Sequence, residues 1–375
     1  MRVCYFGTFE RDYPRNAILI RALRAQGIEV VECHEPLWEN TRDKTGGYAR
    51  APSLLRLALA LAASYVRLAA RHRSVGPHDA CLVGYIGQPD VFLARLLHRR
   101  RRSPVVFVPM ISLYDTAVHD RAMFSPRSPL ARVLFWLDYA SLHLARVVVA
   151  DTEQEREFFS ERFGLSKERI VVVPVGAEEN IFRPTASFEA KDGQFRVLFY
   201  GKFIPLHGVA HILAAARLLE GEGVRFTLIG AGQLRRQMEA RAKGAGLTNT
   251  EFSDWVPLEE LPRRMAQADV CLGIFDPGEK AARVVPNKVY QAMAAARPVI
   301  TGDSPAARSL LGDSVWLCPR GSGPALAEAI RRLRQDPELR RELALRGYRR
   351  FRERFSAERL GASLKKTLLD LTARG

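Results

Sequence analysis

The sequence predicts an α/β protein made of two doubly wound, Rossmann-like domains that face a central cleft. The first observation behind this prediction is length, because 375 residues are too many for one ordinary hydrophobic core. The second is that short apolar runs alternate with helical patterns, which is typical of parallel sheets covered by helices. The third is that this alternation stops at one polar stretch after Pro184 and then restarts. Ligands are therefore expected at the carboxyl ends of the strands and in the cleft.

Short apolar runs mark the expected strands, and amphipathic patterns between them mark the expected helices. In the first half we expect strands at residues 3–6, 28–31, 80–84, 105–108, 147–150 and 170–173, with helices at 17–26, 89–98, 129–145 and 152–163. In the second half we expect strands at residues 197–200, 226–229, 270–274, 298–301 and 315–317. The polar stretch separates an N-terminal acceptor-side domain at 1–185 from a C-terminal domain at 186–350. Residues 351–375 are expected to form a helical tail that packs across the domains.

The charge balance favours anionic partners. Lys and Arg number 57 against 41 Asp and Glu, which gives a formal net charge of +16. Phosphorylated ligands, an anionic lipid surface and nucleic acid all fit such a surplus. The run HRRRR at 98–102 is the best argument for nucleic acid, but it lies at a predicted helix end without interleaved aromatic residues. We therefore expect no specific nucleic-acid partner.

The one long apolar stretch, residues 53–73, is too short to cross a bilayer. Its uncharged part lies between Arg56 and Arg67, whereas a spanning helix needs about 20 apolar residues. The stretch is either a core-facing helix or a helix whose basic rim also touches a membrane surface. The start of the chain predicts no signal peptide, since a strand-like run follows Met1 and Arg2 directly. We expect a cytoplasmic protein, with peripheral attachment to the inner face of the cell membrane as the second option.

The cysteines predict reduced thiols. They are Cys4, Cys33, Cys81, Cys271 and Cys318. Their number is odd, no two are close in sequence, and several lie in strand-like apolar runs. We therefore expect core thiols in a cytoplasm and no metal site.

Two glycine-containing turns in the second half suit phosphate binding. The sequence FYGKFIPLHGV at 199–209 ends a strand at Gly201, places Lys202 on the loop and enters a helix near Gly208. A cation between a strand end and a helix N-terminus suits a phosphate or diphosphate, because backbone N–H groups add to its charge. The sequence LIGAGQ at 228–233 has the same strand-to-turn pattern with Gly230. That second pattern is equally consistent with a turn that needs glycine for its geometry alone.

The sequence PNKVYQAMAAARPVITG at 286–302 combines the start of a helix with a following strand. Pro286 fits the first helical turn, and the step before Pro298 ends the helix. Asn287, Lys288 and Gln291 therefore lie in the first turns, where backbone N–H groups are unpaired and the helix dipole is positive. This position favours contact with an anionic ligand.

Two polar loops follow predicted strands in the first half, which is a usual position for a binding site. The loop at 5–16 contains Gly7, Asp12, Arg15 and Asn16. The loop at 109–124 contains Asp115, His119, Asp120 and Arg121. Both can also be solvated surface loops whose charged residues only cap turns.

In this order the motifs resemble those of the retaining, nucleotide-sugar-dependent glycosyltransferases of family 4, which have the GT-B fold. The resemblance covers nearly the whole chain. Its motifs are the glycine loop after the first strand, the region of His119, VVVPVGAEENIF at 171–182, and the sequences at 199–209, 228–233 and 286–302. The resemblance implies that the C-terminal domain holds the nucleotide diphosphate and that the N-terminal domain holds the acceptor.

The resemblance also implies roles for individual residues. Lys202 matches the basic residue that contacts the diphosphate, and His207 stands where the family has a lysine. Arg283 and Gln291 replace two glutamates, the later of which binds ribose in the family. We interpret this as a donor site that depends more on phosphate, because Arg283 and Lys288 add cations while Gln291 can still accept a hydrogen bond from ribose. Replacing Gln291 by Glu is then expected to be tolerated.

The predicted function is transfer of a hexose-type sugar, with retention, from a nucleotide diphosphate donor such as a UDP-sugar to a carbohydrate, natural-product or lipid-linked acceptor. Catalytic roles are expected for His119, Asp120, Lys202 and Lys288. Donor contacts are expected for Gly7, Gly201, Lys202, His207, Gly230, Asn287, Lys288 and Gln291, and acceptor contacts for Asp12, Arg15, Asn16 and Asp115. No cofactor or metal is expected, because lysines and helix N-termini can neutralise the diphosphate. The alternatives are a nucleotide-sugar 2-epimerase and a non-catalytic protein that binds nucleotide sugars or an anionic surface.

Overall fold

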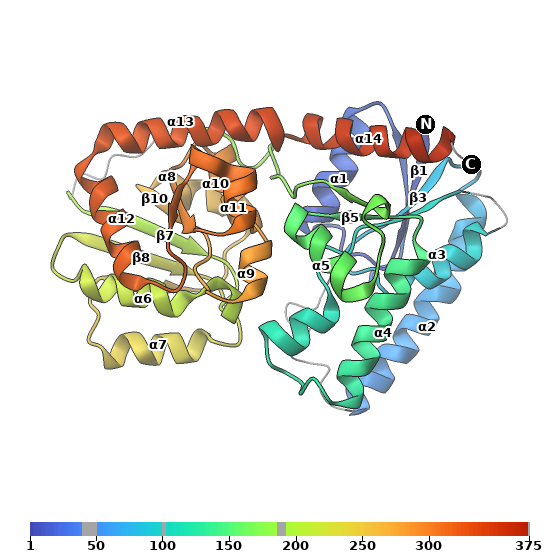
Figure 1. The fold of residues 1–375 in the computed structure, drawn as a ribbon, viewed down its shortest axis with the longest axis horizontal. Helices are drawn as coiled ribbons and strands as arrows, with labels where there is room; N and C mark the ends of the chain where they lie inside the picture. Colours follow the sequence, from blue (N-terminus) through green and yellow to red (C-terminus); the bar gives the residue numbers. More distant parts are fainter. Residues whose placement is uncertain (40–50, 100–102, 186–192, 374–375) are drawn as a thin grey trace. The chain divides into compact units, whose positions relative to one another are not determined.

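The computed structural model describes the backbone of residues 1–39, 51–99, 103–185 and 193–373, which form two compact units (Figure 1). The N-terminal unit contains Met1–Pro174 and Ala357–Gly375, and the C-terminal unit contains Val175–Ser356. Within the described residues, each unit has a six-stranded parallel sheet with helices on both faces. The predicted fold class, two Rossmann-like domains, is therefore confirmed.

The sheet of the N-terminal unit has the order β2-β1-β3-β4-β5-β6, with parallel neighbours. Its strands are β1 (Arg2–Gly7), β2 (Glu29–His34), β3 (Ala80–Val83), β4 (Val105–Phe107), β5 (Val147–Ala150) and β6 (Ile170–Val172). The chain passes from β1 to β2 on one side and then to β3 on the other. The carboxyl ends of β1 and β3 therefore border a topological switch point, where open α/β sheets bind ligands.

Alternate residues of β1 show how both faces of this sheet are covered. Val3 and Tyr5 pack on one face and Cys4 and Phe6 on the other. The first face is covered by α1 (Pro14–Ala25) and α14 (Ala357–Ala373), and the second by α2 (Ala51–Ser74), α3 (Asp90–His98), α4 (Pro129–Leu144) and α5 (Glu153–Phe163). Because both faces are buried, the strands appear in the sequence as continuous apolar runs.

The sheet of the C-terminal unit has the order β12-β11-β10-β7-β8-β9, again with parallel neighbours. Its strands are β7 (Phe195–Tyr200), β8 (Val224–Ile229), β9 (Thr250–Ser253), β10 (Val270–Leu272), β11 (Val299–Gly302) and β12 (Trp316–Cys318). The chain builds outward from β7 to β9 and then resumes at β10 on the other side of β7. The switch point of this unit therefore lies at the carboxyl ends of β7 and β10.

Alternate residues of β7 again point to two separate hydrophobic clusters. Val197 and Phe199 belong to one cluster, and Leu198 and Tyr200 belong to the other. The first is covered by α6 (Val209–Leu218), α7 (Arg235–Gly244) and α12 (Gly323–Gln335), and the second by α8 (Leu261–Ala266), α10 (Asn287–Ala294) and α11 (Pro305–Leu311). The helix α13 (Pro337–Arg354) contributes to both clusters, while the short α9 (Glu279–Arg283) precedes α10.

The boundary between the units lies earlier in the chain than residue 185, the position expected from the sequence. Val175, Ala177 and Phe182 pack with Leu198 and Tyr200 in the core of the C-terminal unit. These apolar residues place the segment after Pro174 in the C-terminal unit, before the polar stretch that marked the boundary in the sequence.

The last helix returns to the N-terminal unit. α14 packs along α1, and a Cβ placed on Gly361 would lie 2.2 Å from the carbonyl oxygen of Ala22. Only glycine permits such a close approach of two helix backbones. The expected tail at 351–375 is therefore divided, because its residues as far as Ser356 belong to the C-terminal unit and the remainder to the N-terminal unit.

The helix α2 contains the long apolar stretch. Leu68 on one side of α2 is buried in the core, whereas Leu55, Leu59 and Val66 are each more than half exposed. No helix in the described part of the chain is both long and apolar enough to cross a membrane. The core-facing interpretation therefore holds for the side of α2 that carries Leu68, and the opposite side is exposed.

Candidate functional site

Two glycine turns meet at the carboxyl edge of the C-terminal sheet. Gly201 follows β7 with φ 139° and Gly230 follows β8 with φ 136°, values that residues with a side chain rarely adopt. A Cβ placed on Gly230 would lie 2.0 Å from the carbonyl oxygen of Gly201. Gly230 is therefore required by the close approach of the two turns, whereas a side chain at Gly201 would meet those of Lys288 and His207.

Lys288 enters this edge from the first turn of α10. Pro286 is the N-cap of the helix, so Lys288 is its second residue, and its side chain is only 6% exposed. The ammonium Nζ lies 4.0 Å from the centre of the Phe199 ring, and a Cβ placed on Gly201 would lie 2.9 Å from it. The cation thus occupies space that the missing side chain of Gly201 leaves open, against the face of an aromatic ring.

His207 is the second ring at this edge. It lies in the short turn before α6, its Nδ1 bonds the carbonyl oxygen of Lys202, and this Nδ1 is 3.4 Å from Lys288 Nζ. Because a carbonyl can only accept, Nδ1 carries the hydrogen and Lys288 makes no hydrogen bond to it. Lys202 itself is half-buried on the turn. The structure therefore brings Gly201, His207 and Lys288 together.

The charge of Lys288 is not balanced by a protein anion. Burial lowers the pKa of Lys288 well below its usual value. Among the described residues, no carboxylate forms an ion pair with its ammonium group. A buried cation without a counterion is costly, and an anion bound beside it removes that cost. The carboxyl edge of the C-terminal sheet is therefore suited to an anionic ligand.

Gln291 lies one turn further along α10, and both the oxygen and the nitrogen of its side-chain amide form hydrogen bonds to other side chains. Its Oε1 accepts from the Tyr200 hydroxyl at 3.0 Å, and its Nε2 donates to Glu178 Oε2 at 3.0 Å. The residue is 3% exposed. The resemblance implies that Gln291 binds ribose, whereas in the structure its amide donates to Glu178 from the segment VVVPVGAEENIF. Asn287, the first residue of α10, is half-buried, and Arg283 lies 3.9 Å from Glu279.

The carboxyl edge of the N-terminal sheet is organised around Asp90, a residue that no motif in the sequence indicates. Gly7 ends β1 with φ 130°, and a Cβ placed there would lie 2.3 Å from Asp90 Oδ2. The backbone N–H of Thr8 donates to this oxygen at 2.6 Å, and the Thr8 hydroxyl lies 3.0 Å from it. Burial raises the pKa of Asp90 to about 6. Gly7 therefore accommodates an internal acid.

Arg15 and Asn16, both expected to contact an acceptor, are fully buried in the N-terminal unit. Arg15 pairs with Asp151 at 2.8 Å and donates to the carbonyls of Val173 and Pro174. Asn16 donates to the carbonyls of Glu10 and Tyr85 and accepts from the Tyr5 hydroxyl and the Tyr85 N–H. These contacts join the start of α1 to neighbouring segments of the unit. Asp12, in contrast, is exposed.

The loop after β4 leads into a π-helix at Asp115–Asp120. Asp138 on α4 fixes its start by accepting from the Ser112 hydroxyl at 2.7 Å and from the Tyr114 N–H at 2.9 Å. Burial raises the pKa of Asp138 to about 6. Asp115 is buried, Asp120 is half-buried, and His119 is exposed with its ring 5.3 Å from that of Tyr114. His119 is thus accessible from solvent at the carboxyl end of a strand.

Comparisons with known proteins agree with the fold and with the order of the two domains along the chain. Residues 14–176 match the model of the glycosyl transferase 4-like domain, and residues 194–336 match that of the glycosyl transferases group 1. The first match lies almost wholly in the N-terminal unit and the second in the C-terminal unit. The two matches together define the class of glycosyltransferases built from two Rossmann-like domains. The chain belongs to the glycosyl transferase group that these two models describe.

Curated relatives are glycosyltransferases that align over part of their length. The chain is 26% identical to the amylovoran biosynthesis glycosyltransferase AmsK of Erwinia amylovora, over 46% of this chain and 44% of the relative. It is 26% identical to the probable glycosyltransferase WbjE of Pseudomonas aeruginosa, over 54% of this chain and 52% of the relative. The chain therefore spans about half the length of the curated relatives it matches.

Solved structures with the same fold are matched over their whole length. The sucrose-phosphate synthase of Thermosynechococcus elongatus has a TM-score of 0.74 at 17% identity, covering 100% of this chain and 99% of that one. Anabaena Alr3699/HepE in complex with UDP-glucose has a TM-score of 0.69 at 14% identity, covering 99% of this chain and 100% of that one. At these identities the likeness concerns the fold alone.

Proposed function

We propose that the protein is a glycosyltransferase that moves a sugar from a nucleotide diphosphate donor to a hydroxyl of a carbohydrate, natural-product or lipid-linked acceptor. The observation that carries the proposal is the buried ammonium of Lys288 at the carboxyl edge of the C-terminal sheet, without a protein carboxylate to balance it. Membership of a glycosyl transferase group and the UDP-glucose complex of a protein with the same fold support the choice of a nucleotide sugar.

In this proposal the C-terminal unit binds the diphosphate. Lys288 neutralises the leaving phosphate, whose negative charge grows in the transition state, so its contact strengthens as the reaction proceeds. The N–H groups at the start of α6, next to Gly208, and Lys202 on the turn supply further positive potential. His207 positions this turn through its bond to the Lys202 carbonyl. Gly230 and Asn287 border the same edge.

We extend the proposal to the stereochemistry and the acceptor. In the transfer with retention that we propose, the bond from the anomeric carbon to the diphosphate breaks while the acceptor oxygen attacks from the same side. The acceptor proton then passes to the leaving phosphate oxygen, so no protein nucleophile is needed. In the N-terminal unit the loop of Asp115, His119 and Asp120 is the proposed acceptor region, because it follows a strand and exposes His119.

Nucleotide binding by Lys288→Met tests the donor assignment. Methionine keeps the length of the buried side chain and removes its charge. We expect UDP, GDP or ADP to raise the melting temperature of the wild type, and Lys288→Met to bind that nucleotide about 10- to 100-fold more weakly, since a charged hydrogen bond contributes about 1.5–3 kcal/mol. Lys243→Met, which changes an exposed lysine on α7, is the matched control and should bind normally. Equal affinity of the Lys288 variant and the wild type would contradict the proposal.

A second proposal is attachment of the N-terminal unit to an anionic membrane surface. Helices α2, α3 and α4 cover one face of its sheet (Figure 1). Each of these helices exposes large apolar side chains. The exposed side chains are Leu55, Leu59 and Val66 on α2, Phe92 and Leu96 on α3, and Val133 and Trp136 on α4. Exposed arginines, among them Arg56, Arg67 and Arg132, lie on the same helices. Apolar residues with a basic rim suit insertion between anionic headgroups.

Sedimentation with lipid vesicles tests the membrane proposal. We expect the wild type to co-sediment with vesicles containing phosphatidylserine at low salt and to be released by high salt, because each basic residue near the surface contributes about 1 kcal/mol. A variant with Leu59→Ser and Trp136→Ser should bind less. Leu345→Ser, which alters an exposed apolar residue of the C-terminal unit, should bind like the wild type. A wild type that stays in the supernatant at low salt would rule out this attachment.

A further inference from the structure

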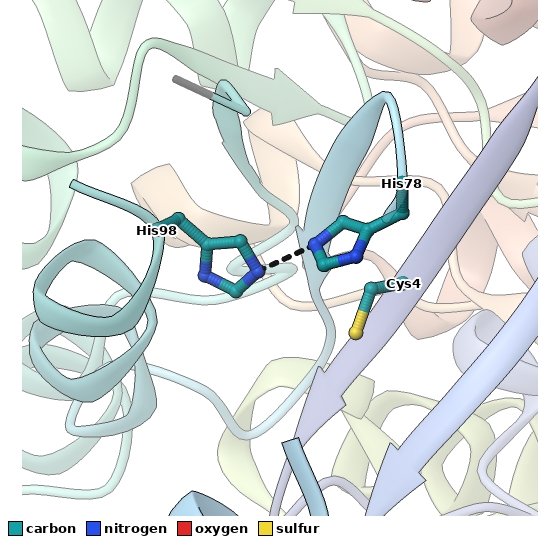
Figure 2. A group of neighbouring side chains, drawn as sticks. All are labelled: Cys4, His78 and His98. Atoms are coloured by element: carbon teal, nitrogen blue, oxygen red, sulfur yellow. Dashed lines mark hydrogen bonds between the residues drawn. The ribbon is translucent and has the colours of Figure 1, made fainter. Parts of the chain in front are cut away.

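A cluster of histidines and a cysteine lies inside the N-terminal unit, at the end of its sheet opposite to the carboxyl edge. Figure 2 shows Cys4 on β1, His78 just before β3 and His98 at the end of α3. Cys4 and His98 are fully buried, and His78 is 8% exposed. The Cys4 sulfur and a ring nitrogen from each histidine lie within 4.8 Å of one another. Three segments far apart in sequence thus present soft ligand atoms to one small volume.

The backbone contacts of the two histidines fix which nitrogen carries a hydrogen. His78 Nδ1 lies 3.0 Å from the carbonyl oxygen of Gly76, and His98 Nδ1 lies 2.7 Å from that of Ala94. A carbonyl oxygen only accepts, so both Nδ1 atoms are donors. Both Nε2 atoms then carry lone pairs when the rings are neutral. Metal-binding histidines typically have this arrangement, with the outer N–H bonded to a carbonyl.

The two Nε2 atoms nevertheless face each other at 2.7 Å, as the dashed line in Figure 2 shows. Two lone pairs repel at this distance unless a cation lies between them, and the cation is either a shared proton or a metal ion. His72 Nε2 also approaches His98 Nε2, at 3.1 Å. The Cys4 sulfur and the nitrogens of His78 and His98 therefore form one group, with the His72 nitrogen beside that of His98. Imidazole and thiolate are ligands that zinc prefers.

The surroundings also favour a cation. His98 is the last residue of α3 and His72 lies in the last turn of α2, where the helix dipoles are negative. The negative ends of two helices therefore lie at the cluster, where they stabilise a positive charge.

We propose that Cys4, His78 and His98 bind a zinc ion, with His72 as the fourth ligand, and that this ion fixes β1 to the ends of α2 and α3. Zinc–nitrogen bonds of about 2.0–2.1 Å at a tetrahedral angle separate two nitrogens by about 3.3 Å. The observed separations of 2.7 and 3.1 Å therefore need the rings to move apart by less than about 1 Å. Because the four ligands come from four segments, the ion holds the unit together rather than taking part in sugar transfer.

Metal titration of the full chain tests this site. The protein is purified under reducing conditions, stripped with a chelator and titrated with zinc or cobalt. We expect one equivalent of zinc to bind and to raise the melting temperature. Cobalt should give visible bands of a tetrahedral ion and a near-ultraviolet sulfur-to-cobalt charge-transfer band. If the stripped wild type binds neither metal and its melting temperature stays unchanged, the proposal is wrong and the histidines share a proton.

Variants locate the metal within the cluster. Cys4→Ser should abolish the charge-transfer band, and His98→Asn should weaken zinc binding by about 100-fold or more. Cys271→Ser, which removes a buried thiol of the C-terminal unit, is the matched control and should keep the band. A band that persists in Cys4→Ser, or that disappears in Cys271→Ser, would place the metal elsewhere. If His98→Asn fails to fold, the wild-type titration and the Cys4 variant still decide the question.

Discussion

The carboxyl edges of the two sheets use the same local geometry with opposite charges. The first strand of each sheet, β1 or β7, ends in a glycine with positive φ, Gly7 or Gly201. In each unit a helix that follows a neighbouring strand places a buried charged group against that glycine. The group is Asp90 of α3 in the N-terminal unit and Lys288 of α10 in the C-terminal unit.

The two charged groups differ in how their hydrogen-bonding capacity is used. Asp90 accepts from the backbone and the hydroxyl of Thr8, so the N-terminal edge is closed by internal contacts. Lys288 lies against the Phe199 ring and beside His207, with no carboxylate among the described residues to balance it. The charged group beside the glycine at the end of the first strand therefore stabilises the fold in the N-terminal unit, whereas in the C-terminal unit it suits ligand binding. A glycine at the end of a strand does not by itself indicate a phosphate site.

Alanine at the two glycines should have the largest effects and should separate these roles. In Gly7→Ala the new Cβ would displace Asp90 from the Thr8 N–H, and the backbone would be strained, so we expect a loss of about 3–5 kcal/mol in unfolding free energy. In Gly201→Ala the Cβ meets the flexible end of Lys288, so the loss should be about 1–3 kcal/mol. Nucleotide affinity, however, should fall about 10- to 100-fold. Urea unfolding and nucleotide titration measure the two quantities.

Gly27→Ala is the reference for these variants, because it has a positive φ and no atom within 4 Å of the new Cβ. Its cost measures backbone strain alone. If Gly7→Ala costs no more than Gly27→Ala, Asp90 is not held against Gly7. If Gly201→Ala binds nucleotide like the wild type, the C-terminal edge is not the donor site.

The fold could be predicted from the sequence because buried parallel strands are short apolar runs, which remain visible without the structure. The strand β9 (Thr250–Ser253) was missed, since TEFS has one large apolar residue and lies at the edge of its sheet, where one side needs no partner strand. The boundary between units was placed too late because the polar stretch after Pro184 follows, rather than contains, the point where the chain changes core.

Lys288 and Gly201 could be named as candidates from the sequence because each lies in a short motif at the end of a strand or the start of a helix. Asp90 and Asp138 act through contacts with distant segments, and nothing in their own neighbourhoods signals this. The cluster of Cys4, His78 and His98 is likewise invisible as a spacing pattern, because β1, the loop before β3 and α3 supply one ligand each.

Gln291→Glu should have the next largest effect, because it adds a buried acid to the C-terminal edge. From the sequence alone, this change is expected to be tolerated. In the structure, however, the new carboxylate would replace the amide that donates to Glu178 at 3.0 Å. Two buried carboxylates in contact repel, so we expect a loss of about 3 kcal/mol in unfolding free energy at pH 7.5. At pH 5 the loss should shrink, because one of the two acids takes up a proton.

Gln335→Glu, on the exposed end of α12, is the matched control for this change and should alter the stability by about 0.5 kcal/mol or less. Urea unfolding of both variants at the two pH values gives the comparison. Wild-type stability of Gln291→Glu at pH 7.5 would show that Gln291 does not rely on Glu178 and would restore the ribose assignment.

The smallest expected effect is a pH dependence of the unfolding free energy that comes from Asp90 at the N-terminal edge. The folded protein raises the pKa of Asp90 from 3.8 to about 6, so between these values the folded state binds more protons than the unfolded state. The stabilisation is complete below pH 3.8 and is lost as the pH rises through about 6. Between pH 4 and pH 7.5 this loss amounts to roughly 2 kcal/mol, because each pKa unit corresponds to about 1.4 kcal/mol. Asp90→Asn should remove this share of the pH dependence and leave the share of Asp138, whose pKa is raised in the same way.

Lys288 should act with the opposite sign, since its lowered pKa makes stability rise with pH below the usual value of 10.5, and Lys288→Met should abolish that rise. Urea unfolding of the three proteins from pH 4 to pH 9 measures both slopes, and equal slopes in all three would show that neither charge is buried at its edge.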